Sequence, residues 1–141
     1  MDFEPSFGEE LQTEYLLPED RAEEALQKLQ ELGEWITPPL LISEIRTIHE
    51  DDLWMSPHYG RPTVGLHFTW KKDWAAVEPV LGKLESALAP LEARPHWGKV
   101  STLDFKQVRE LYPKWKPFRD LAHQMDPERK FRNGYLDTLL D

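Results

Sequence analysis

The hydrophobic periodicity of this chain switches between two residues and about 3.6 residues, and the order of these switches constrains the fold more than any other feature. Alternation predicts strands at residues 9–17, 40–48 and 63–70, and a short extended piece around residues 93–97 is a candidate for a fourth strand. Helical spacing predicts one helix between Pro18 and Gly33 and a second between Asp73 and Leu88. The order strand, helix, strand, strand, helix, strand is that of a ferredoxin-like α+β domain, with an antiparallel sheet and helices on one face.

Residues after Gly98 predict helices and no further strand. We expect Asp104 to cap a helix over residues 105–111, Pro117 to open a segment that ends at Leu121, and residues 134–140 to form a terminal helix. Residues 49–62 contain too many Asp, Pro and Gly residues for regular structure. They predict a long loop, and long loops in compact domains are often functional.

Length and charge limit the possible partners. The 141 residues fit one domain, and we expect a single domain over positions 1–141. The net charge of −9 disfavours nucleic acid and anionic membranes, and the absence of cysteine excludes disulfides and thiolate chemistry. Positions 1–5 have neither the basic region nor the apolar region of a signal peptide, so we expect a cytoplasmic protein.

The strand at 40–48 carries an acidic and a basic residue among bulky apolar ones. Strict alternation puts Leu40, Ile42, Glu44 and Arg46 on one face. Charges among apolar neighbours are costly to desolvate unless they are paired or meet a polar ligand. A structural ion pair on a solvated sheet face is an equally good interpretation of this strand alone.

The strand at 63–70 has one wholly apolar face, and its other face holds Gly65, His67 and Thr69. If it lies beside the strand that carries Glu44 and Arg46, the two polar faces merge into one patch suited to a compound with many hydroxyl groups. A single strand histidine such as His67 is more often structural than catalytic.

A dense cluster of functional groups spans residues 94–99, with the sequence RPHWGK. A polar turn explains this cluster as well as a functional site does. His49, His58 and His67 recur every nine residues. That interval matches no usual ligand spacing, so we predict no metal site.

Several segments resemble the alditol (xylitol) oxidase and D-arabinono-1,4-lactone oxidase family, flavoproteins of the vanillyl-alcohol-oxidase type. The resemblance covers the chain from Gly8 onward. It is carried by SEIRTIHEDDLWMSPHYGR at 43–61, HFTW at 67–70, ARPHWGK at 93–99 and YPKWKPFRDLAHQMDPERKFRN at 112–133. The HWGK segment and the DPxxKFxN ending are the most specific parts.

This resemblance implies roles for five residues. Glu44, Arg46, Thr69 and Lys99 match substrate contacts, with Arg46 and Lys99 acting on the reacting hydroxyl as catalytic residues. His96 matches a histidine beside the flavin. We expect these five side chains to converge on one open, exposed face. We expect His67 to contact these side chains and not the substrate itself.

The resemblance also implies a cofactor and a reaction. In the family, FAD accepts a hydride from an alcohol carbon of a polyol or aldonolactone, and oxygen then forms hydrogen peroxide. FAD is held mainly by an N-terminal domain that has no counterpart in this chain. We therefore expect a substrate-binding C-terminal domain that is inactive unless a flavin-binding domain is supplied in cis or in trans. The alternative is a non-catalytic ferredoxin-like module for small-molecule binding or dimerisation.

Overall fold

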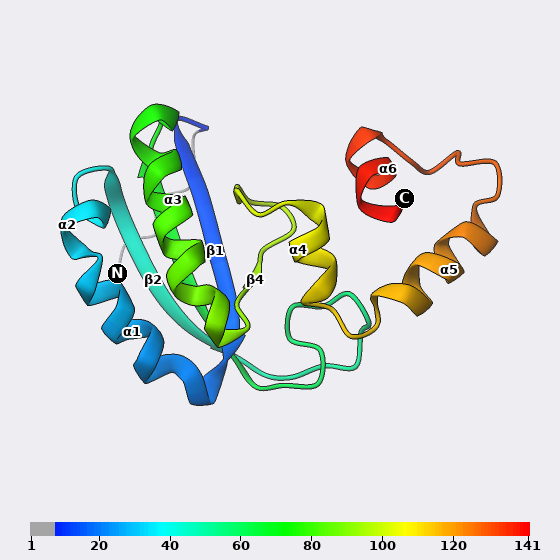
Figure 1. Cartoon of the computed structure of the whole chain (residues 1–141), viewed down its shortest axis with the longest axis horizontal. Helices are drawn as coiled ribbons and strands as arrows, with labels where there is room; N and C mark the ends of the chain where they lie inside the picture. Colours follow the sequence, from blue (N-terminus) through cyan, green and yellow to red (C-terminus); the bar gives the residue numbers. More distant parts are fainter. Residues whose placement is uncertain (1–7) are drawn as a thin grey trace.

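The computed structural model describes residues 8–141. The expectation that positions 1–5 form no signal peptide concerns residues outside this range. Its centre is a four-stranded antiparallel sheet (Figure 1) with the order β2-β3-β1-β4. This order, with the succession of elements along the chain, confirms the ferredoxin-like α+β class. The strands are β1 (Glu10–Pro18), β2 (Leu40–Ile48), β3 (Thr63–Lys71) and the two-residue β4 (Arg94–Pro95).

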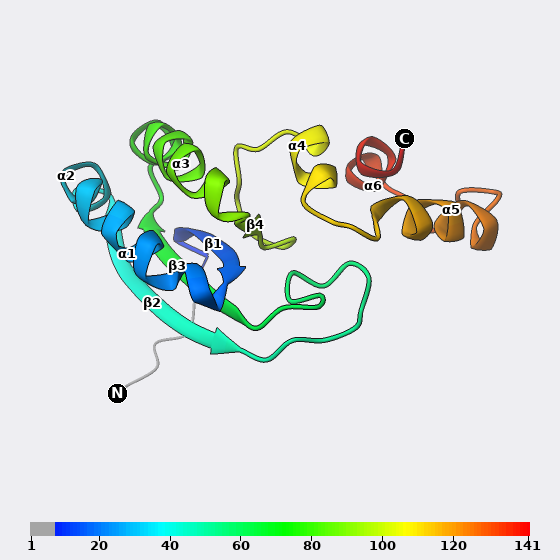
Figure 2. The ribbon, with the colours of Figure 1, turned by 60° about the horizontal axis from the view of Figure 1, so that its bottom comes forward.

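Helices cover one face of this sheet, as Figure 2 shows for α1, α2 and α3. The chain passes from β1 into η1 (Glu19–Arg21), α1 (Ala22–Glu31) and α2 (Gly33–Ile36), and from β3 into α3 (Trp74–Leu88) and η2 (Ala89–Leu91). Alternate residues of β1 and β3 point into this layer because every second strand side chain faces the same way. The buried core consists mainly of Tyr15, Leu17, Leu66, Phe68 and Trp70 from the sheet, with Val77, Leu81, Leu84 and Leu88 from α3.

Trp70 is the largest side chain buried in this core, and its indole Nε1 donates a hydrogen bond of 3.0 Å to the buried Thr13 hydroxyl. Replacing Thr13 by valine keeps the shape but strands the indole N–H. We expect Thr13→Val to lower the free energy of unfolding by about 1–3 kcal/mol. Urea unfolding measures this, and Thr47→Val on exposed β2 is the matched control. Equal effects of the two substitutions would contradict the importance of this hydrogen bond.

One helix boundary agrees with the sequence prediction and one differs. The first helix ends at Glu31 with Leu32 as its C-cap, so Gly33 directly follows the cap as predicted, and it also begins α2, which brings the buried Ile36 onto the core. The later helix α5 (Trp115–Met125) starts before Pro117 and extends beyond Leu121. Pro117 is its third residue, where a missing N–H costs no helical hydrogen bond.

An irregularity in β2 corrects the predicted face of Leu40. The register shifts between Leu40 and Ile42, so Leu40 pairs with Trp70 and packs against the core. Ile42 pairs with Thr69 and shares the other face with Glu44 and Arg46. A bulge inserts one extra residue, and this reverses the alternation that the sequence pattern assumes.

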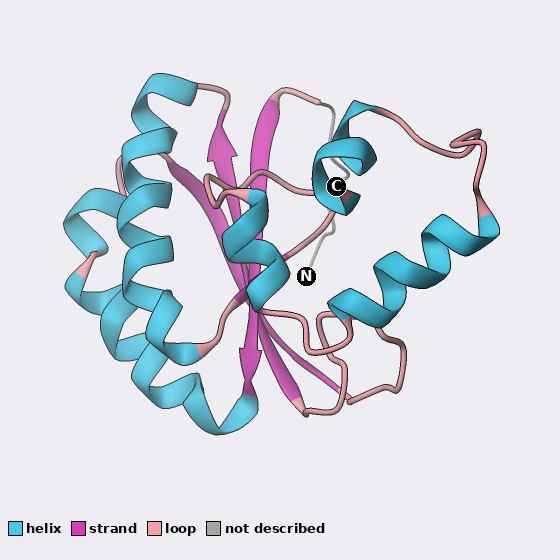
Figure 3. Ribbon diagram, turned by 45° about the vertical axis from the view of Figure 1, so that its right-hand side comes forward, coloured by secondary structure: helices cyan, strands magenta, loops and turns pink. Residues whose placement is uncertain are grey.

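Three helices follow β4 and lie beyond that edge of the sheet, away from α1 and α2 (Figure 3). They are α4 (Phe105–Glu110), α5 and α6 (Gly134–Leu140). As predicted, Asp104 caps α4, accepting a hydrogen bond of 2.8 Å from Gln107 N. Among residues 8–141, no helix is both long and apolar enough to cross a membrane.

Candidate functional site on the open face of the sheet

The face of the sheet away from α1 and α3 carries a row of ionisable side chains. Glu14 on β1 pairs with His67 on β3, and His67 pairs with Glu44 on β2. Two residues after Glu44 on β2, Arg46 pairs with Gly65 of β3. Because paired residues project on the same side of a sheet, three strands that are distant in sequence contribute to one surface.

Lys99 completes this group through its ion pair with Glu14. Its Nζ lies 2.5 Å from Glu14 Oε2 and 3.5 Å from His67 Nδ1. Arg46 contacts the Glu44 carboxylate and places its other terminal nitrogen 3.6 Å from Glu14 Oε1. His67 Nδ1 is 3.4 Å from Glu44 Oε2. We call Glu14, Glu44, Arg46, His67 and Lys99 the open-face cluster.

Burial changes across the open-face cluster. The side chains of Glu14, His67 and Lys99 are 6%, 9% and 15% exposed, whereas those of Glu44 and Arg46 are 46% and 45% exposed. Burial opposes ionisation of Glu14, but the hydrogen bond and charge of Lys99 outweigh it, with help from Arg46, and the pKa of Glu14 is lowered. The cluster therefore holds two carboxylates and two cations whose charges balance.

His67 is neutral in this setting, because burial and the nearby Lys99 charge lower its pKa. A histidine in the unfolded chain has a pKa of about 6.5. Below that pH the unfolded chain binds a proton at His67, whereas the folded chain binds it only at lower pH. Stability is then present above this pH and is lost as the pH falls toward the folded-state pKa.

We expect His67→Gln to weaken the loss of stability between about pH 8 and about pH 5.5, measured by urea unfolding at each pH. A smaller pH dependence remains in this variant because burial also lowers the pKa of His58. His58→Gln is therefore the matched comparison. An unchanged pH dependence in His67→Gln would show that His67 is not held neutral.

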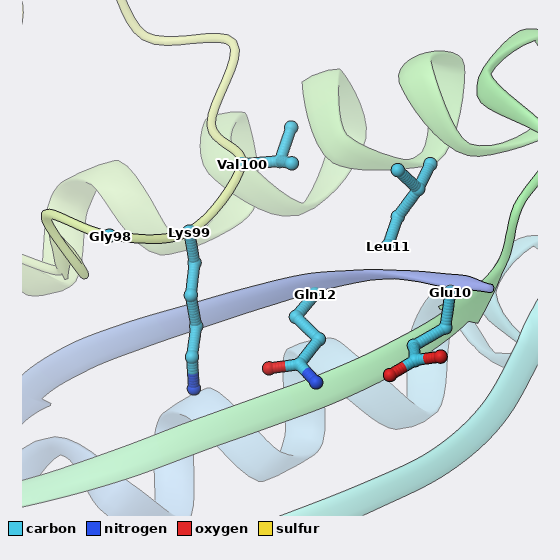
Figure 4. Close-up of a pocket in the computed structure, with 6 residues that line it drawn as sticks. All are labelled: Glu10, Leu11, Gln12, Gly98, Lys99 and Val100. Atoms are coloured by element: carbon cyan, nitrogen blue, oxygen red, sulfur yellow. The ribbon is translucent and has the colours of Figure 1, made fainter. Parts of the chain in front are cut away.

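Backbone hydrogen bonds position Lys99 beside β1. His96 N donates to Glu14 O at 2.9 Å, and Val100 N donates to Gln12 O at 2.9 Å. These bonds extend the strand pairing that begins at β4. Figure 4 shows the Lys99, Gln12 and Glu10 side chains on one side of β1, with Leu11 and Val100 on the other. Leu11 and Val100 pack against the core, so the direction of Lys99 follows from strand alternation.

Two of the hollows that adjoin the cluster bear on the predicted site. One of about 450 Å³ lies beside Lys99 and is lined by the residues of Figure 4. The other, of about 300 Å³, is bordered by Glu14 and Arg46 on the sheet and by residues from two loops. Its remaining lining residues are Leu16, Ile48, Pro57, His58, His96 and Trp97.

His96 and Trp97 both line this second hollow but differ in their exposure to solvent and in their hydrogen bonds. His96 is exposed, and its Nδ1 accepts a hydrogen bond of 3.0 Å from Gly98 N, which leaves Nε2 as the protonated donor of a neutral ring. Trp97 is half-buried, and its Nε1 donates to Met55 O at 2.9 Å. The expected open face is therefore present on the His96 side. The neighbouring Arg94 is buried and structural, donating to Pro57 O and Leu111 O.

The structure brings together Glu44, Arg46 and Lys99, three of the five predicted site residues. His96 borders the adjoining hollow. Thr69 lies on the same face, paired with Gln12 and Ile42 two residues beyond His67, without a side-chain hydrogen bond to the cluster among the described residues.

Sequence inspection missed Glu14. Its place among the polar positions of 9–17 is visible in the alternation, but its contact with Lys99 depends on strand register. The three histidines that recur every nine residues, His49, His58 and His67, are not grouped as metal ligands. In the part of the chain from residue 8 to the end, no three His, Cys, Asp or Glu side chains are grouped to hold a metal ion.

The sequence that forms this fold and this cluster matches a known family. The sequence profile described as D-arabinono-1,4-lactone oxidase matches residues 9–139, which include every member of the open-face cluster. The chain belongs to the D-arabinono-1,4-lactone oxidase family. The resemblance in its sequence segments is thus confirmed at the level of the family.

Individual relatives of this D-arabinono-1,4-lactone oxidase family member are named as oxidoreductases. Alditol oxidase of Streptomyces sp. (strain IKD472 / FERM P-14339) is 47% identical over 140 residues, which cover 99% of this chain and 34% of the relative. L-gulono-1,4-lactone dehydrogenase of Mycobacterium tuberculosis (strain ATCC 25618 / H37Rv) is 31% identical over 132 residues, covering 90% and 30%. L-gulonolactone oxidase of Mus musculus is 25% identical over 144 residues, covering 97% and 32%. The chain spans about a third of the length of these curated relatives.

Proposed function

We propose that residues 1–141 are the substrate-binding domain of an FAD-dependent oxidase that acts on a polyol or an aldonolactone. The observation that carries this proposal is the open-face cluster of two cations and two carboxylates, of which Glu14 and Arg46 line a hollow of about 300 Å³. Such a site offers donors and acceptors to several hydroxyl groups at once. The 47% identity to an alditol oxidase supports the same substrate class.

Each member of the site has a chemical task in this proposal. Lys99 and Arg46 stabilise the negative charge that develops on the reacting oxygen as its proton leaves, because fixed cations act strongly on such charge where water is excluded, as beside the largely buried Lys99. Glu44 accepts hydrogen bonds from hydroxyls farther along the substrate and fixes which carbon reacts. Thr69 offers a hydroxyl at the next register position of the same face.

His96 fits the FAD part of the proposal. Its ring is exposed beside the hollow and presents an Nε2–H donor, which suits the acceptor atoms of a flavin. The flavin, when bound, supplies the hydride acceptor that no side chain can provide. We infer that a flavin-binding domain in cis or in trans is required, and we place the protein in the cytoplasm with neither nucleic acid nor membrane as a partner.

A chimaera tests this function directly. The two-thirds of the Streptomyces alditol oxidase outside the matched segment would be joined to this chain and loaded with FAD. We expect anaerobic addition of xylitol, sorbitol or L-gulono-1,4-lactone to bleach the flavin, and oxygen to return its colour with hydrogen peroxide release. The chain alone should remain colourless with FAD. A chimaera that binds flavin but is bleached by no polyol or lactone would leave the non-catalytic binding module as the better account.

A further inference from the structure

Glu14 is the carboxylate of the open-face cluster most shielded from solvent, and both catalytic candidates converge on it. Its Oε2 is 2.5 Å from Lys99 Nζ, and its Oε1 is 3.6 Å from an Arg46 nitrogen. In the described residues, Lys99 has no other carboxylate within ion-pair distance. Glu44, the other acidic member, contacts Arg46 and His67 instead.

The opposite strand leaves room for the Glu14 carboxylate. A Cβ placed on Gly65 would lie 3.1 Å from Glu14 Oε1 and 3.4 Å from Ile48 Cδ1. The distance to Glu14 Oε1 is tighter than ordinary van der Waals contact, and the distance to Ile48 Cδ1 is at the lower edge of the ordinary range. Gly65 therefore accommodates a close approach, and the group that approaches is the carboxylate of Glu14.

Lys99 needs such a partner because it is a compact charge on a flexible four-carbon stem. Without Glu14, the Lys99 ammonium and the Arg46 guanidinium would have like charges and no shared anion between them. Arg46 would keep Glu44, but Lys99 would have only the neutral His67 within reach.

We propose that Glu14 is a positioning residue that fixes Lys99 and Arg46 where the reacting oxygen of the substrate becomes negative. This inference rests on the proposed function for its catalytic part. Its structural part, the organisation of the two cations by Glu14, can be measured without flavin or substrate.

The first test follows the His67 ring by NMR titration in the 141-residue chain. The groups facing His67 are Glu14 from β1, Glu44 and Arg46 from β2, and Lys99 from the segment after β4. We expect Glu14→Gln to change the pKa of His67, because the carboxylate that favours its protonated form is lost and the two cations that oppose that form are no longer held in place. Glu10→Gln is the control, because Glu10 lies on the same strand and face as Glu14. The two are four residues apart, which at about 3.3 Å per residue is about 13 Å. An unchanged His67 pKa in Glu14→Gln would overturn the inference.

The second test uses the flavin-loaded chimaera and follows flavin reduction without oxygen. We expect Glu14→Gln to slow reduction by about 10–100-fold, a typical loss when a group that orients a reactive group is removed. Glu14→Asp keeps the charge and should recover part of the rate. Gly65→Ala keeps every charge but pushes the carboxylate aside, so it should also slow reduction, and it tests the idea if Glu14→Gln fails to fold.

The outcomes separate the two proposals. A wild-type chimaera that is not reduced by any polyol or lactone contradicts the proposed function, while the His67 titration still decides whether Glu14 organises the cations. A reactive wild type with normal reduction in both Glu14→Gln and Gly65→Ala would overturn the role of Glu14. Equal slowing in the exposed control Glu78→Gln would overturn it as well.

Discussion

Replacing Lys99 or Arg46 by alanine is expected to slow flavin reduction in the flavin-loaded chimaera by about 10²- to 10³-fold each. Lys99 is largely buried and paired with Glu14, so its charge is poorly screened by water. Arg46 is about half exposed at 45% but lies between two carboxylates. If both cations act on the reacting oxygen only as its charge develops, kcat and kcat/KM fall together.

Stopped-flow reduction without oxygen isolates this step from reoxidation. Lys106→Ala and Arg21→Ala remove exposed cations of the same two types outside the open face and serve as matched controls. Lys99→Arg and Arg46→Lys should each recover little, because a planar fork and a point charge place their donors differently. Reduction at the wild-type rate in Lys99→Ala would remove Lys99 from the catalytic residues.

The sequence was sufficient for the parts of the fold that local pattern determines. In β3, the apolar positions Val64, Leu66, Phe68 and Trp70 all face the helices. Their alternation is unbroken because one side of that strand is wholly buried, and a slip of one residue would expose the entire set. The polar side with His67 and Thr69 was therefore placed correctly.

Local pattern could not determine features that depend on pairing between strands. The bulge near Leu40 adds one residue to β2, and nothing in the spacing of apolar residues marks its position. The ion pair of Glu14 and Lys99 joins residues 85 positions apart. Its discovery required the register of β1 against β3 and the backbone bonds that extend β4 beside β1.

A second buried carboxylate connects the core to the segment that carries Lys99. Glu85 on α3 is 5% exposed and accepts hydrogen bonds from Tyr15 Oη at 3.0 Å, Ser101 Oγ at 2.8 Å and Thr102 N at 2.9 Å. The Thr102 hydroxyl contacts it too. Burial and the charge of Glu85 raise the pKa of Tyr15 well above its ordinary value, so the phenol stays protonated and donates. Ser101 and Thr102 are separated from Lys99 only by Val100, and Glu85 thereby holds this segment against α3.

We expect Glu85→Ala to lower the free energy of unfolding by roughly 2–5 kcal/mol, because the buried Tyr15 O–H and the partly buried Thr102 N–H lose their acceptor. Urea unfolding measures the loss, and Glu78→Ala, exposed on the same helix, should change stability by less than about 0.5 kcal/mol. A double-mutant cycle with Tyr15→Phe isolates one contact, for which we expect a coupling of about 0.5–3 kcal/mol. Strictly additive effects would mean that Glu85 and Tyr15 stabilise the fold independently. In that case the 3.0 Å hydrogen bond would not connect β1 to α3 energetically.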